Sequence, residues 1–451
     1  MSSPSARDGG EAEETSRQPR AEETGSQPRA EETGSQPRAE EVRRRWRAGG
    51  LRSIAGVVAG LALIGLWVWA AHLLWHSSEP AGSHLAQLDP SHYFSRAFLA
   101  RSASYQRFLD IDGLLSTIAL VVVLVIYAAR GARLMRESAA GPIGTGMLLG
   151  MLGFAIVWLA QVPFGLAAVW WERRHHVSHQ GYVSSLVESF SALGSKFLFV
   201  SFALALAMGL ARLTRSWWVL AVPLFAALAL LFSFLSIYLI PDTHPLRTAT
   251  TLTDARQLAR VEGIPNTRVE VQNVARFTTA PNAESVGFGP TRRVILWDTL
   301  LDGRFDRSQV RAVLGHELGH LAHHHIAKGV GWLALFLIPA TALIAYFTRG
   351  RGGLGRPEAV PLALLVFIVL QLIALPLQNI VSRHIEAEAD WASLRATHDP
   401  AGTRSLFRTL ASSSLEDPEP PTWSYVLNAN HPTIMQRIEM VNAWQQRNPA
   451  R

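Results

Sequence analysis

The 451-residue chain contains no cysteine and few charged residues. Without thiols it cannot be a disulfide-stabilised secreted module, and any metal site in it must be built from histidine and carboxylate ligands. Only 17% of the residues are charged and 49% are hydrophobic, whereas soluble proteins carry roughly 25% charged residues. A chain this apolar is not disordered throughout. The shortage of charge indicates that part of its surface faces lipid.

The first 50 residues contain no apolar run that could form a core. They carry a repeat with a period of nine residues, in which QPRAEET at 18–24 and 27–33 is followed by QPRAEEV at 36–42. A segment of this composition buries too little apolar surface to offset the entropy lost on ordering. We therefore predict a disordered tail over residues 1–50.

Seven long apolar runs follow this tail. About 20 residues of helix are needed to cross the hydrocarbon core of a bilayer, and several of the runs reach that length. A single run is also compatible with a buried core helix, but seven of them favour an integral membrane protein. We place five spans in an N-terminal membrane domain, 51–240, and two in a C-terminal domain, 241–451. The runs cover roughly residues 54–75, 112–130, 144–170, 197–213, 217–240, 329–348 and 359–381.

The basic residues beside these runs predict the orientation of the chain, because arginine and lysine are enriched in short cytoplasmic loops. Alternate loops place thirteen arginines on one side, against five arginines and one lysine on the other. The N-terminus is therefore predicted to be cytoplasmic, and the segment after the fifth run to begin on the extracytoplasmic side. The larger set is Arg43, Arg44, Arg45, Arg47, Arg52, Arg130, Arg133, Arg136, Arg212, Arg215, Arg349, Arg351 and Arg356, and the smaller is Arg96, Arg101, Arg107, Arg173, Arg174 and Lys196.

The segment between the fifth and sixth apolar runs has mixed polarity. Residues 252–263 have helical spacing between a Thr/Asp start and a glycine stop. Residues 268–274 and 284–288 alternate like strands, and 292–297 are apolar enough for a third strand. We therefore expect a small β-sheet followed by a helix over 307–325.

This last helix contains His316-Glu317-Leu318-Gly319-His320. Residues four apart share one face of a helix, so both imidazoles can reach one ion, and Glu317 leans towards the same site. Neutral histidine nitrogens suit Zn²⁺, and two of them leave room for a third ligand and a water molecule. A carboxylate beside that water can accept its proton. The alternative is an amphipathic helix with incidental histidines.

The third ligand decides the class of metal site. A metzincin would have a histidine at the position that Ile326 occupies, so that class is excluded. His323, His324 and His325 are expected at the helix end, where partial positive charge suits the helix dipole, rather than as ligands.

A better candidate follows the seventh apolar run. If that run continues as a helix, Asn379 and Arg383 lie on one of its faces. Glu386 and Asp390 share that face, whereas Glu388 points away. Glu386 can then complete a His₂Glu set, and Asp390 can hydrogen-bond a ligand imidazole. The alternative is a solvated helix whose charged residues form ion pairs along its surface.

Together these residues resemble the M48 family of zinc metalloproteases, over about residues 50–445. The apolar runs before HELGH, and Glu172-Arg173-Arg174 with Ser178 and Gln180, favour the Ste24/CAAX prenyl protease branch over the shorter HtpX-like branch. His176 stands where that branch usually has glycine. The resemblance rests on HELGH at 316–320, SRxxExxAD at 382–390, PNAESVGFGPTRRVILWDTLL at 281–301, and Asn430, His431, Pro432, Arg437 and Ile438.

The resemblance implies a mainly α-helical integral membrane protein of about seven spans, with a zincin-type (gluzincin) M48 peptidase domain that contains a small β-sheet and faces a water-filled chamber. It implies that His316, His320 and Glu386 bind one zinc ion. It also implies that Glu317 is the general base and that His431 stabilises the oxyanion.

The resemblance further implies residues that support the site or the substrate. Asp390 and Arg437, together with Arg383, would lie behind the metal ligands. Asn282 and Ala283, together with Asn379, would contact a peptide that binds as an added β-strand, a mode in which backbone pairing makes little demand on sequence.

The favoured hypothesis is a multi-pass zinc endopeptidase in a lipid bilayer, acting on membrane-associated or exported proteins. Prenylated substrates imply a eukaryotic host, whereas a composition rich in Arg and Ala and poor in Lys is more like that of a high-GC bacterium. The alternative is a transporter or lipid-handling protein that keeps zinc for structure. The net charge of +7 suggests a nucleic-acid partner, but no basic stripe with interleaved aromatics lies outside the loop edges, so none is expected.

Overall fold

The structure is a computed structural model that describes residues 57, 58, 60–80, 88–134 and 140–449 of the chain. The tail predicted over residues 1–50, with its repeats, lies outside the described residues. The chain divides into two units, Met1–Leu66 and Trp67–Arg451. The helices and strands described below belong to the second unit, apart from one apolar helix near the N-terminus.

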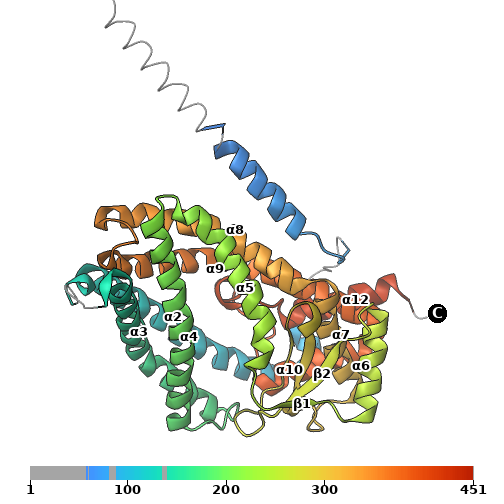
Figure 1. Ribbon diagram of the computed structural model, residues 1–451. Coiled ribbons are helices and arrows are strands. Elements are labelled where there is room, and N and C mark those ends of the chain that lie inside the picture. Colours follow the sequence, from blue (N-terminus) through green and yellow to red (C-terminus); the bar gives the residue numbers. More distant parts are fainter. Residues whose placement is uncertain (1–56, 59, 81–87, 135–139, 450–451) are drawn as a thin grey trace, which may run out of the picture. The chain divides into compact units, whose positions relative to one another are not determined.

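Helices dominate the second unit, and Figure 1 shows the long ones gathered on one side, with the sheet and α6, α7, α10 and α12 on the other. The long helices are α2 (Arg96–Arg130), α3 (Gly141–Arg174), α4 (Tyr182–Leu213), α5 (Trp217–Leu235), α8 (His325–Thr348) and α9 (Val360–Thr397). The shorter helices are α6 (Ala249–Val261), α7 (Arg307–Ala322), α10 (Pro400–Ser414), α11 (Thr422–Asn428) and α12 (Ile434–Arg447).

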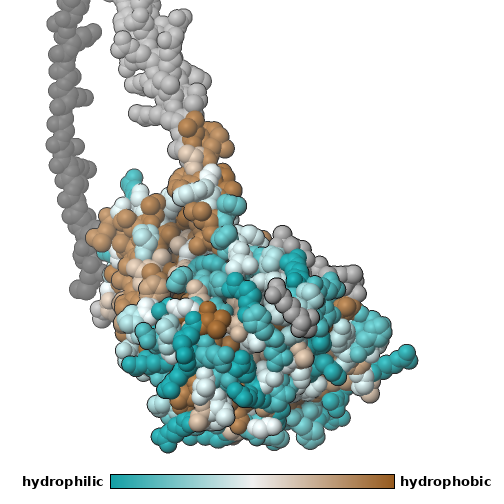
Figure 2. All heavy atoms as spheres, turned by 90° about the vertical axis from the view of Figure 1, so that its right-hand side faces the viewer, coloured by the Kyte–Doolittle hydropathy of each residue, from teal (hydrophilic) through white to brown (hydrophobic). Residues whose placement is uncertain are grey.

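Among the described residues, six helices are long and apolar enough to cross a membrane. At most 28% of the apolar 18-residue window in each is buried within the protein, so these surfaces need lipid to cover them. The prediction is confirmed for six of the seven runs. The first run lies partly outside the described residues, and its described part contains an apolar helix, Gly60–Leu74. Figure 2 shows that the side carrying α6 and α12 is mostly hydrophilic and that hydrophobic residues gather toward one edge of this view.

A four-stranded sheet with the order β1-β2-β4-β3 lies beside the shorter helices. Strands β2 and β4 are parallel, and β1 and β3 pair antiparallel with them, so that β3 lies at the edge beyond β4. The three predicted strands are confirmed, whereas β1 is not predicted, because three residues that include a proline show no alternation. The bounds are β1 (Thr243–Pro245), β2 (Arg268–Gln272), β3 (Ala283–Val286) and β4 (Arg293–Trp297).

The predicted helix over 307–325 is wrong at its C-terminal end. It begins as expected, because Asp306 and Gln309 form a reciprocal capping box at the start of α7. It ends at Ala322, because His324 adopts a left-handed conformation with φ of 56°. His325 therefore begins α8 and turns back toward α7. The helix predicted over 252–263 also differs, since α6 begins and ends a few residues earlier.

α7 and α9 cross at two glycines of α7. A Cβ on Gly319 would lie 2.9 Å from Ala392 Cβ, and a Cβ on Gly315 would lie 2.8 Å from Ser393 Oγ. Both distances are shorter than van der Waals contact, so no larger residue fits without moving the helices apart. Ser393 Oγ also donates to the carbonyl oxygen of Ala312 at 2.7 Å. The crossing therefore holds the two helices in close register.

A hydrophobic core keeps this crossing in place. It joins α6, α7, α10 and α12 to β4 and to the C-terminal part of α9, and its fully buried members include Leu258, Leu318, Leu394, Phe407 and Ile438. α9 itself continues as one helix from the last apolar run to Thr397, as predicted. One helix thus connects the membrane-length helices to this core.

A buried carboxylate ties α6 to the start of α7. Asp254 is 1% exposed and accepts hydrogen bonds from Arg307 Nε and Nη2, both at 2.8 Å, and from Arg311 Nη1. The hydrogen bonds with Arg307 outweigh the opposing effect of burial and lower the pKa of Asp254. The unfolded-state pKa is about 3.9. The stability contributed by Asp254 is therefore complete above that pH and is lost as the pH falls through the folded-state pKa.

We expect Gly319→Ala to destabilise the protein by about 1–3 kcal/mol, because the added methyl group overpacks the α7–α9 crossing. This outweighs the roughly 1 kcal/mol by which alanine favours a helix over glycine. Gly329→Ala in α8 is the matched control, because nothing lies within 4 Å of a Cβ added there. Thermal unfolding in detergent should show a lower midpoint only for Gly319→Ala. Equal midpoints for the two variants would contradict the tight crossing.

We expect Asp254→Asn to cost about 2 kcal/mol at neutral pH, because it removes a buried charged acceptor of two arginines. The stability difference between wild type and variant should shrink as the pH falls from 5 toward the folded-state pKa of Asp254, since the wild-type carboxylate then becomes neutral. Asp302→Asn is the control, because Asp302 is 37% exposed in its pair with Arg304 and such pairs contribute little. Denaturant unfolding across pH measures both, and a pH-independent difference for Asp254→Asn counts against the ion-pair explanation.

Candidate metal centre

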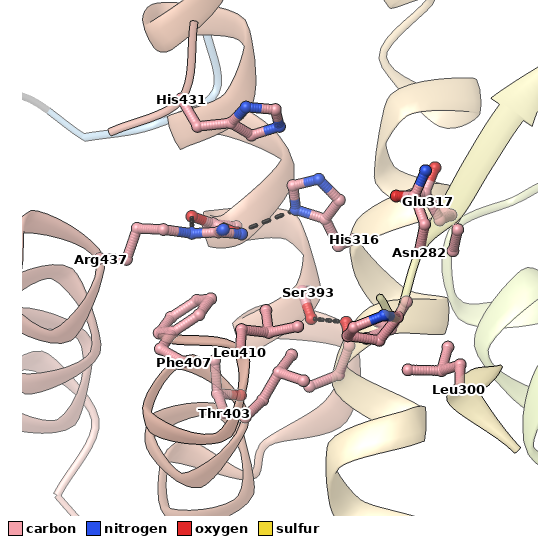
Figure 3. Close-up of a pocket in the computed structure, with 16 residues that line it drawn as sticks. Asn282, Leu300, His316, Glu317, Ser393, Thr403, Phe407, Leu410, His431 and Arg437 are labelled. Atoms are coloured by element: carbon pink, nitrogen blue, oxygen red, sulfur yellow. Dashed lines mark hydrogen bonds and ion pairs between the residues drawn. The ribbon is translucent and has the colours of Figure 1, made fainter. Parts of the chain in front are cut away.

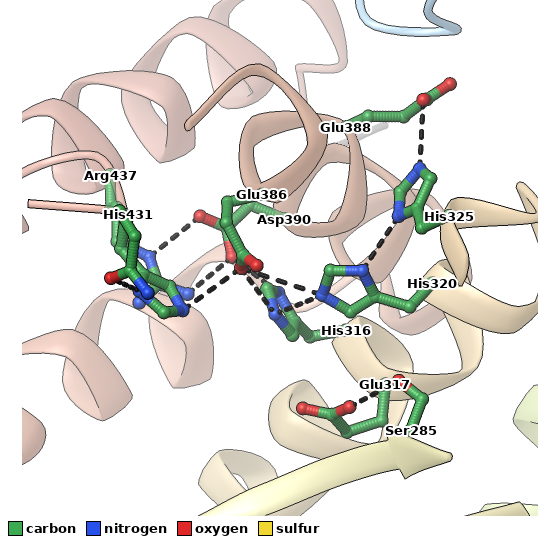
Figure 4. Close-up of polar contacts among 11 residues, drawn as sticks. Ser285, His316, Glu317, His320, His325, Glu386, Glu388, Asp390, His431 and Arg437 are labelled. Carbon is green, nitrogen blue, oxygen red and sulfur yellow. Dashed lines mark hydrogen bonds and ion pairs between the residues drawn. The ribbon is translucent and has the colours of Figure 1, made fainter. Parts of the chain in front are cut away.

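Three side chains that could hold a metal ion converge between α7 and α9 (Figure 4). His316 Nε2 and His320 Nε2 lie 3.0 Å apart. Glu386 Oε2 lies 3.2 Å from the first of these nitrogens and 3.6 Å from the second. The four-residue spacing sets the imidazoles side by side on α7, and α9 carries the carboxylate to them. The structure thus brings together the three residues predicted as zinc ligands.

The chemistry of this group fits a bound cation. Glu386 Oε2 is buried and has no hydrogen-bond partner among the described residues, although ring nitrogens surround it. Burial by itself lowers the pKa of His316, but the carboxylates of Asp390 and Glu386 outweigh it and raise that pKa to about 10. The site therefore favours positive charge at this point. Two imidazole nitrogens and one carboxylate oxygen form a donor set that suits Zn²⁺.

Asp390 and Arg437 lie directly behind His316. Asp390 Oδ1 is 2.9 Å from His316 Nδ1, an arrangement that orients a metal-ligating imidazole and leaves its other nitrogen free. Arg437 donates from Nε to Asp390 Oδ2 at 2.7 Å and from Nη2 to Oδ1 at 2.6 Å. Its guanidinium group also lies 4.2 Å above the ring centre of Phe407. A bidentate partner thus compensates the buried charge of Asp390.

Glu317 lies on the same helix with its carboxylate turned toward the sheet. The residue is 7% exposed, and its Oε2 accepts a hydrogen bond from Ser285 Oγ at 2.7 Å. Ser285 stands on the edge strand β3. The contact therefore fixes the predicted general base between the histidine pair and the open edge of the sheet.

His431 approaches the site from the loop before α12. Its Nε2 lies 3.3 Å from Glu386 Oε2, and its Nδ1 lies 2.8 Å from Asn430 Oδ1. The side chain is 49% exposed, so it forms part of the wall of the site and is not a core residue. This position beside the predicted ligands is compatible with the role predicted for His431.

Arg383 and Asn379 hold the chain that precedes His431. Arg383 Nη1 donates to the carbonyl oxygens of Tyr425, at 3.1 Å, and Ala429, at 2.6 Å. Asn379 Nδ2 donates to the carbonyl oxygens of two neighbouring α11 residues, at 3.2 and 2.8 Å. Asn379 is buried and is absent from the pocket wall. In this geometry both residues anchor α11, and the structure gives the substrate contact predicted for Asn379 no support.

A pocket opens beside the histidine pair and continues toward α10 (Figure 3). Its polar end carries His316, Glu317 and His431, and the predicted substrate residues Asn282 and Ala283 form part of its wall. Beyond them the lining is largely apolar. The apolar residues are Leu300, Ala312, Val313, Leu406, Phe407 and Leu410.

Sequence reasoning misses two contacts of the site. Ser285 belongs to a strand that no motif spacing connects to the HELGH helix. His325 Nδ1 lies 2.8 Å from His320 Nδ1, although five residues along a continuous helix would rotate it about 140° away from His320. The left-handed turn at His324 is what brings it back, and the local sequence carries no signal for that turn.

The paired histidines of one helix and the glutamate of a second form a donor set that could hold a metal ion, within a fold rich in membrane-length helices. Residues 245–445 match the model described as "Peptidase family M48". Similarity to this family therefore covers the segment that contains His316, His320 and Glu386.

Curated relatives match the chain as well. The "Uncharacterized metalloprotease YhfN" of Bacillus subtilis (strain 168) is 31% identical over 242 residues, which cover 51% of this chain and 57% of the relative. The "CAAX prenyl protease 1 homolog" of Caenorhabditis elegans is 26% identical over 239 residues, which cover 45% of this chain and 54% of the relative. Proteins named "Protease HtpX homolog" match as well. The chain spans little more than half the length of these curated relatives.

A solved structure matches a larger part of the chain. The crystal structure of S. mikatae Ste24p aligns with a TM-score of 0.62, covering 84% of this chain and 96% of that chain. The sequence identity is 16%, so the comparison concerns the fold alone. The fold is therefore Ste24-like, with a small sheet and membrane-length helices in one unit.

Proposed function

We propose that this chain is a membrane-embedded zinc-dependent endopeptidase that hydrolyses peptide bonds of membrane-associated or exported proteins. The observation that carries the proposal is the arrangement around α7. A His₂Glu donor set lies beside a glutamate whose carboxylate is held against an open strand edge. A structural zinc site needs the donor set but has no need of that glutamate.

His316, His320 and Glu386 would hold the zinc ion, with Asp390 orienting the first imidazole. When bound, zinc polarises a peptide carbonyl and makes a water molecule more acidic. The protein contributes the geometry, since Arg437 and the α7–α9 crossing keep the three donors in place.

Glu317 is the general base of the proposed reaction. Ser285 Oγ donates a hydrogen bond to Glu317 Oε2. Glu317 Oε1 has no hydrogen-bond partner in the part of the chain that the structure describes. Oε1 is therefore the atom that accepts a proton from the attacking water and later delivers it to the leaving amine. His431 Nε2 stands on the Glu386 side of the pocket. Because its Nδ1 donates to Asn430 Oδ1, Nε2 can donate to the developing oxyanion and stabilise the transition state only when the ring carries both protons.

The substrate binds as an extended strand along β3. This strand lies at the edge of the sheet, and Asn282 and Ala283 lie at the pocket beside it. Backbone pairing positions an extended peptide with little regard to its sequence. The apolar part of the pocket, which includes Leu406 and Phe407, suits an apolar side chain next to the cleaved bond. Prenylation of the substrate is not part of this proposal.

The catalytic side faces away from the cytoplasm. Arg212 Nη1 donates to the carbonyl oxygen of Gly355 at 3.5 Å, which joins the α4–α5 turn to the α8–α9 turn. Both turns are rich in arginine, and such loops remain in the cytoplasm. The metal centre lies at the other ends of α8 and α9, so the same rule directs it to the extracytoplasmic side or to a chamber open to that side.

We expect Glu317→Gln to bind zinc normally but to lower kcat by about 10³-fold or more, because the amide cannot accept the proton of the attacking water. Zinc content by mass spectrometry and cleavage of casein or of a membrane extract measure the two effects. Glu358→Gln, an exposed residue at the arginine-rich turn, is the matched control and should cleave at the wild-type rate. Undiminished cleavage by Glu317→Gln would disprove the mechanism. The transporter alternative instead predicts stoichiometric zinc and no phenanthroline-sensitive cleavage in the wild type.

The absence of cysteine allows a clean test of orientation. We expect a membrane-impermeant maleimide to label Ser412→Cys in intact cells, because exposed Ser412 lies on α10, a helix that lines the pocket next to the metal centre. Glu358→Cys at the arginine-rich turn should react only after the membrane is opened. The wild type provides a background without thiols. Labelling with the opposite pattern would place the catalytic side in the cytoplasm.

A further inference from the structure

A second buried polar cluster lies behind the metal centre, around Glu388. Glu388 points away from the metal ligands, as predicted, but it is 2% exposed and not solvated. Four nitrogens surround its carboxylate, namely the backbone nitrogen of Ser78 at 2.6 Å, Lys328 Nζ at 2.7 Å, His325 Nε2 at 3.0 Å and His323 Nδ1 at 3.4 Å. A buried carboxylate with so many donors is held in one orientation.

His325 connects this cluster to the metal centre. It is 5% exposed, and its two ring nitrogens face in opposite directions. Nε2 meets Glu388, and Nδ1 lies 2.8 Å from His320 Nδ1, as Figure 4 shows. The His320 and His325 rings are nearly perpendicular, at 79°, with centroids 4.9 Å apart. The contact is therefore an edge-on hydrogen bond and not a stacking of the two rings.

The protons in the hydrogen bonds that link His320, His325 and Glu388 can be assigned from the acceptor at the end, the Glu388 carboxylate. An ionised carboxylate only accepts hydrogen bonds, so His325 donates from Nε2 to Glu388. A neutral imidazole carries one N–H, which makes His325 Nδ1 an acceptor. His320 then donates from Nδ1 and keeps the lone pair on Nε2, the atom that faces His316 and Glu386. The His325 tautomer therefore selects the His320 tautomer that can bind a metal.

The same logic already applies to the other histidine of the pair. His316 donates from Nδ1 to Asp390, whose charge is compensated by Arg437. In the hydrogen-bond series from His320 through His325 to Glu388, His325 takes the place of that carboxylate as the direct acceptor. Glu388 stands one step further out, and Lys328 compensates its charge.

We propose that His325 is a positioning residue for the predicted zinc ligand His320 and that Glu388 sets its tautomer. The proposal rests on the metal site of the proposed function but not on peptide cleavage. No other described contact constrains His320 Nδ1, so loss of His325 leaves the ring free to turn and to change tautomer. Outer partners of this kind typically change metal affinity by roughly 10–100-fold.

The cluster also fastens the segment after the first apolar helix to the metal centre. The Ser78 backbone N–H reaches Glu388, and Lys328 Nζ donates to the carbonyl oxygen of His76 at 3.0 Å. His384 Nε2 contacts the carbonyl oxygen of Trp75 at 2.8 Å in the same segment. Docking of this segment therefore contributes to holding Glu388, and through it His325.

The test is zinc affinity of the full-length protein in detergent, measured by competition with a chromophoric chelator. His325→Ala and Glu388→Ala should bind zinc about 10–100-fold more weakly than wild type. His325→Asn carries an amide oxygen near the place of Nδ1 and should retain near-wild-type affinity. His325→Gln carries its amide near the place of Nε2, keeps the contact with Glu388 only, and should lose affinity as His325→Ala does.

His324→Asn is the matched control. His324 is the exposed neighbour with the left-handed conformation, which asparagine tolerates, so this variant should bind zinc as wild type does. Asp390→Asn alters the hydrogen-bond partner of His316, and its loss of zinc affinity shows how large an effect a direct partner of a ligand histidine has. The thermal midpoint of each metal-free variant checks that it is folded.

Wild-type zinc affinity in a folded His325→Ala, or an equal loss in His325→Ala and His325→Asn, overturns the inference. An equal loss in His324→Asn overturns it as well, because the effect would not belong to His325. If the wild-type protein binds no zinc at all, the proposed function fails and this inference fails with it. If the wild type binds zinc but cleaves nothing, the peptidase proposal fails while the inference stands.

Discussion

The close crossing of α7 and α9 is the constraint on which the rest of the site depends. Because Gly315 and Gly319 have no side chains, α7 and α9 pack closely. At this separation the carboxylate of Glu386 on α9 lies next to the ring nitrogens of His316 and His320 on α7. A wider crossing would leave the histidine pair on one helix and the carboxylate on the other, too far apart to share an ion. The hydrophobic core formed with α6, α10 and α12 packs against the same two helices. The packing that stabilises the fold therefore also keeps the three predicted metal ligands in place.

Two buried carboxylates of α9 connect this helix to the elements around the crossing. Asp390 joins the guanidinium group of Arg437 to His316, and Glu388 joins the ammonium group of Lys328 to His325. An unpaired buried carboxylate is costly, but each of these has a cation and several hydrogen bonds to offset the loss of hydration. The same contacts that make the charges tolerable also orient the imidazoles of α7. The hydrogen bonds and ion pairs of Asp390 and Glu388 therefore contribute both to folding and to the geometry of the metal site.

α9 links the membrane-length helices to the metal centre and also positions α11. Its N-terminal part is one of the membrane-length helices, and its C-terminal part carries Glu386. Between them, Asn379 and Arg383 hold the backbone of α11, from which the chain leads to His431. The membrane helix thus sets the position of the loop on the far side of the pocket.

Local sequence determined much of this protein. The apolar runs indicated the membrane-length helices, and the spacings within HELGH and from Asn379 to Asp390 placed the metal-binding candidates on shared helix faces, because helical periodicity is a local property. The end of α7 departed from expectation, and β1 was too short to show a pattern. Only the tertiary structure decided that Ser285 holds Glu317, that Asn379 and Arg383 anchor α11, and that His325 returns to His320 through a left-handed turn. These contacts depend on helix crossings, strand order and a single backbone torsion, and they join residues whose separation in the sequence follows no period.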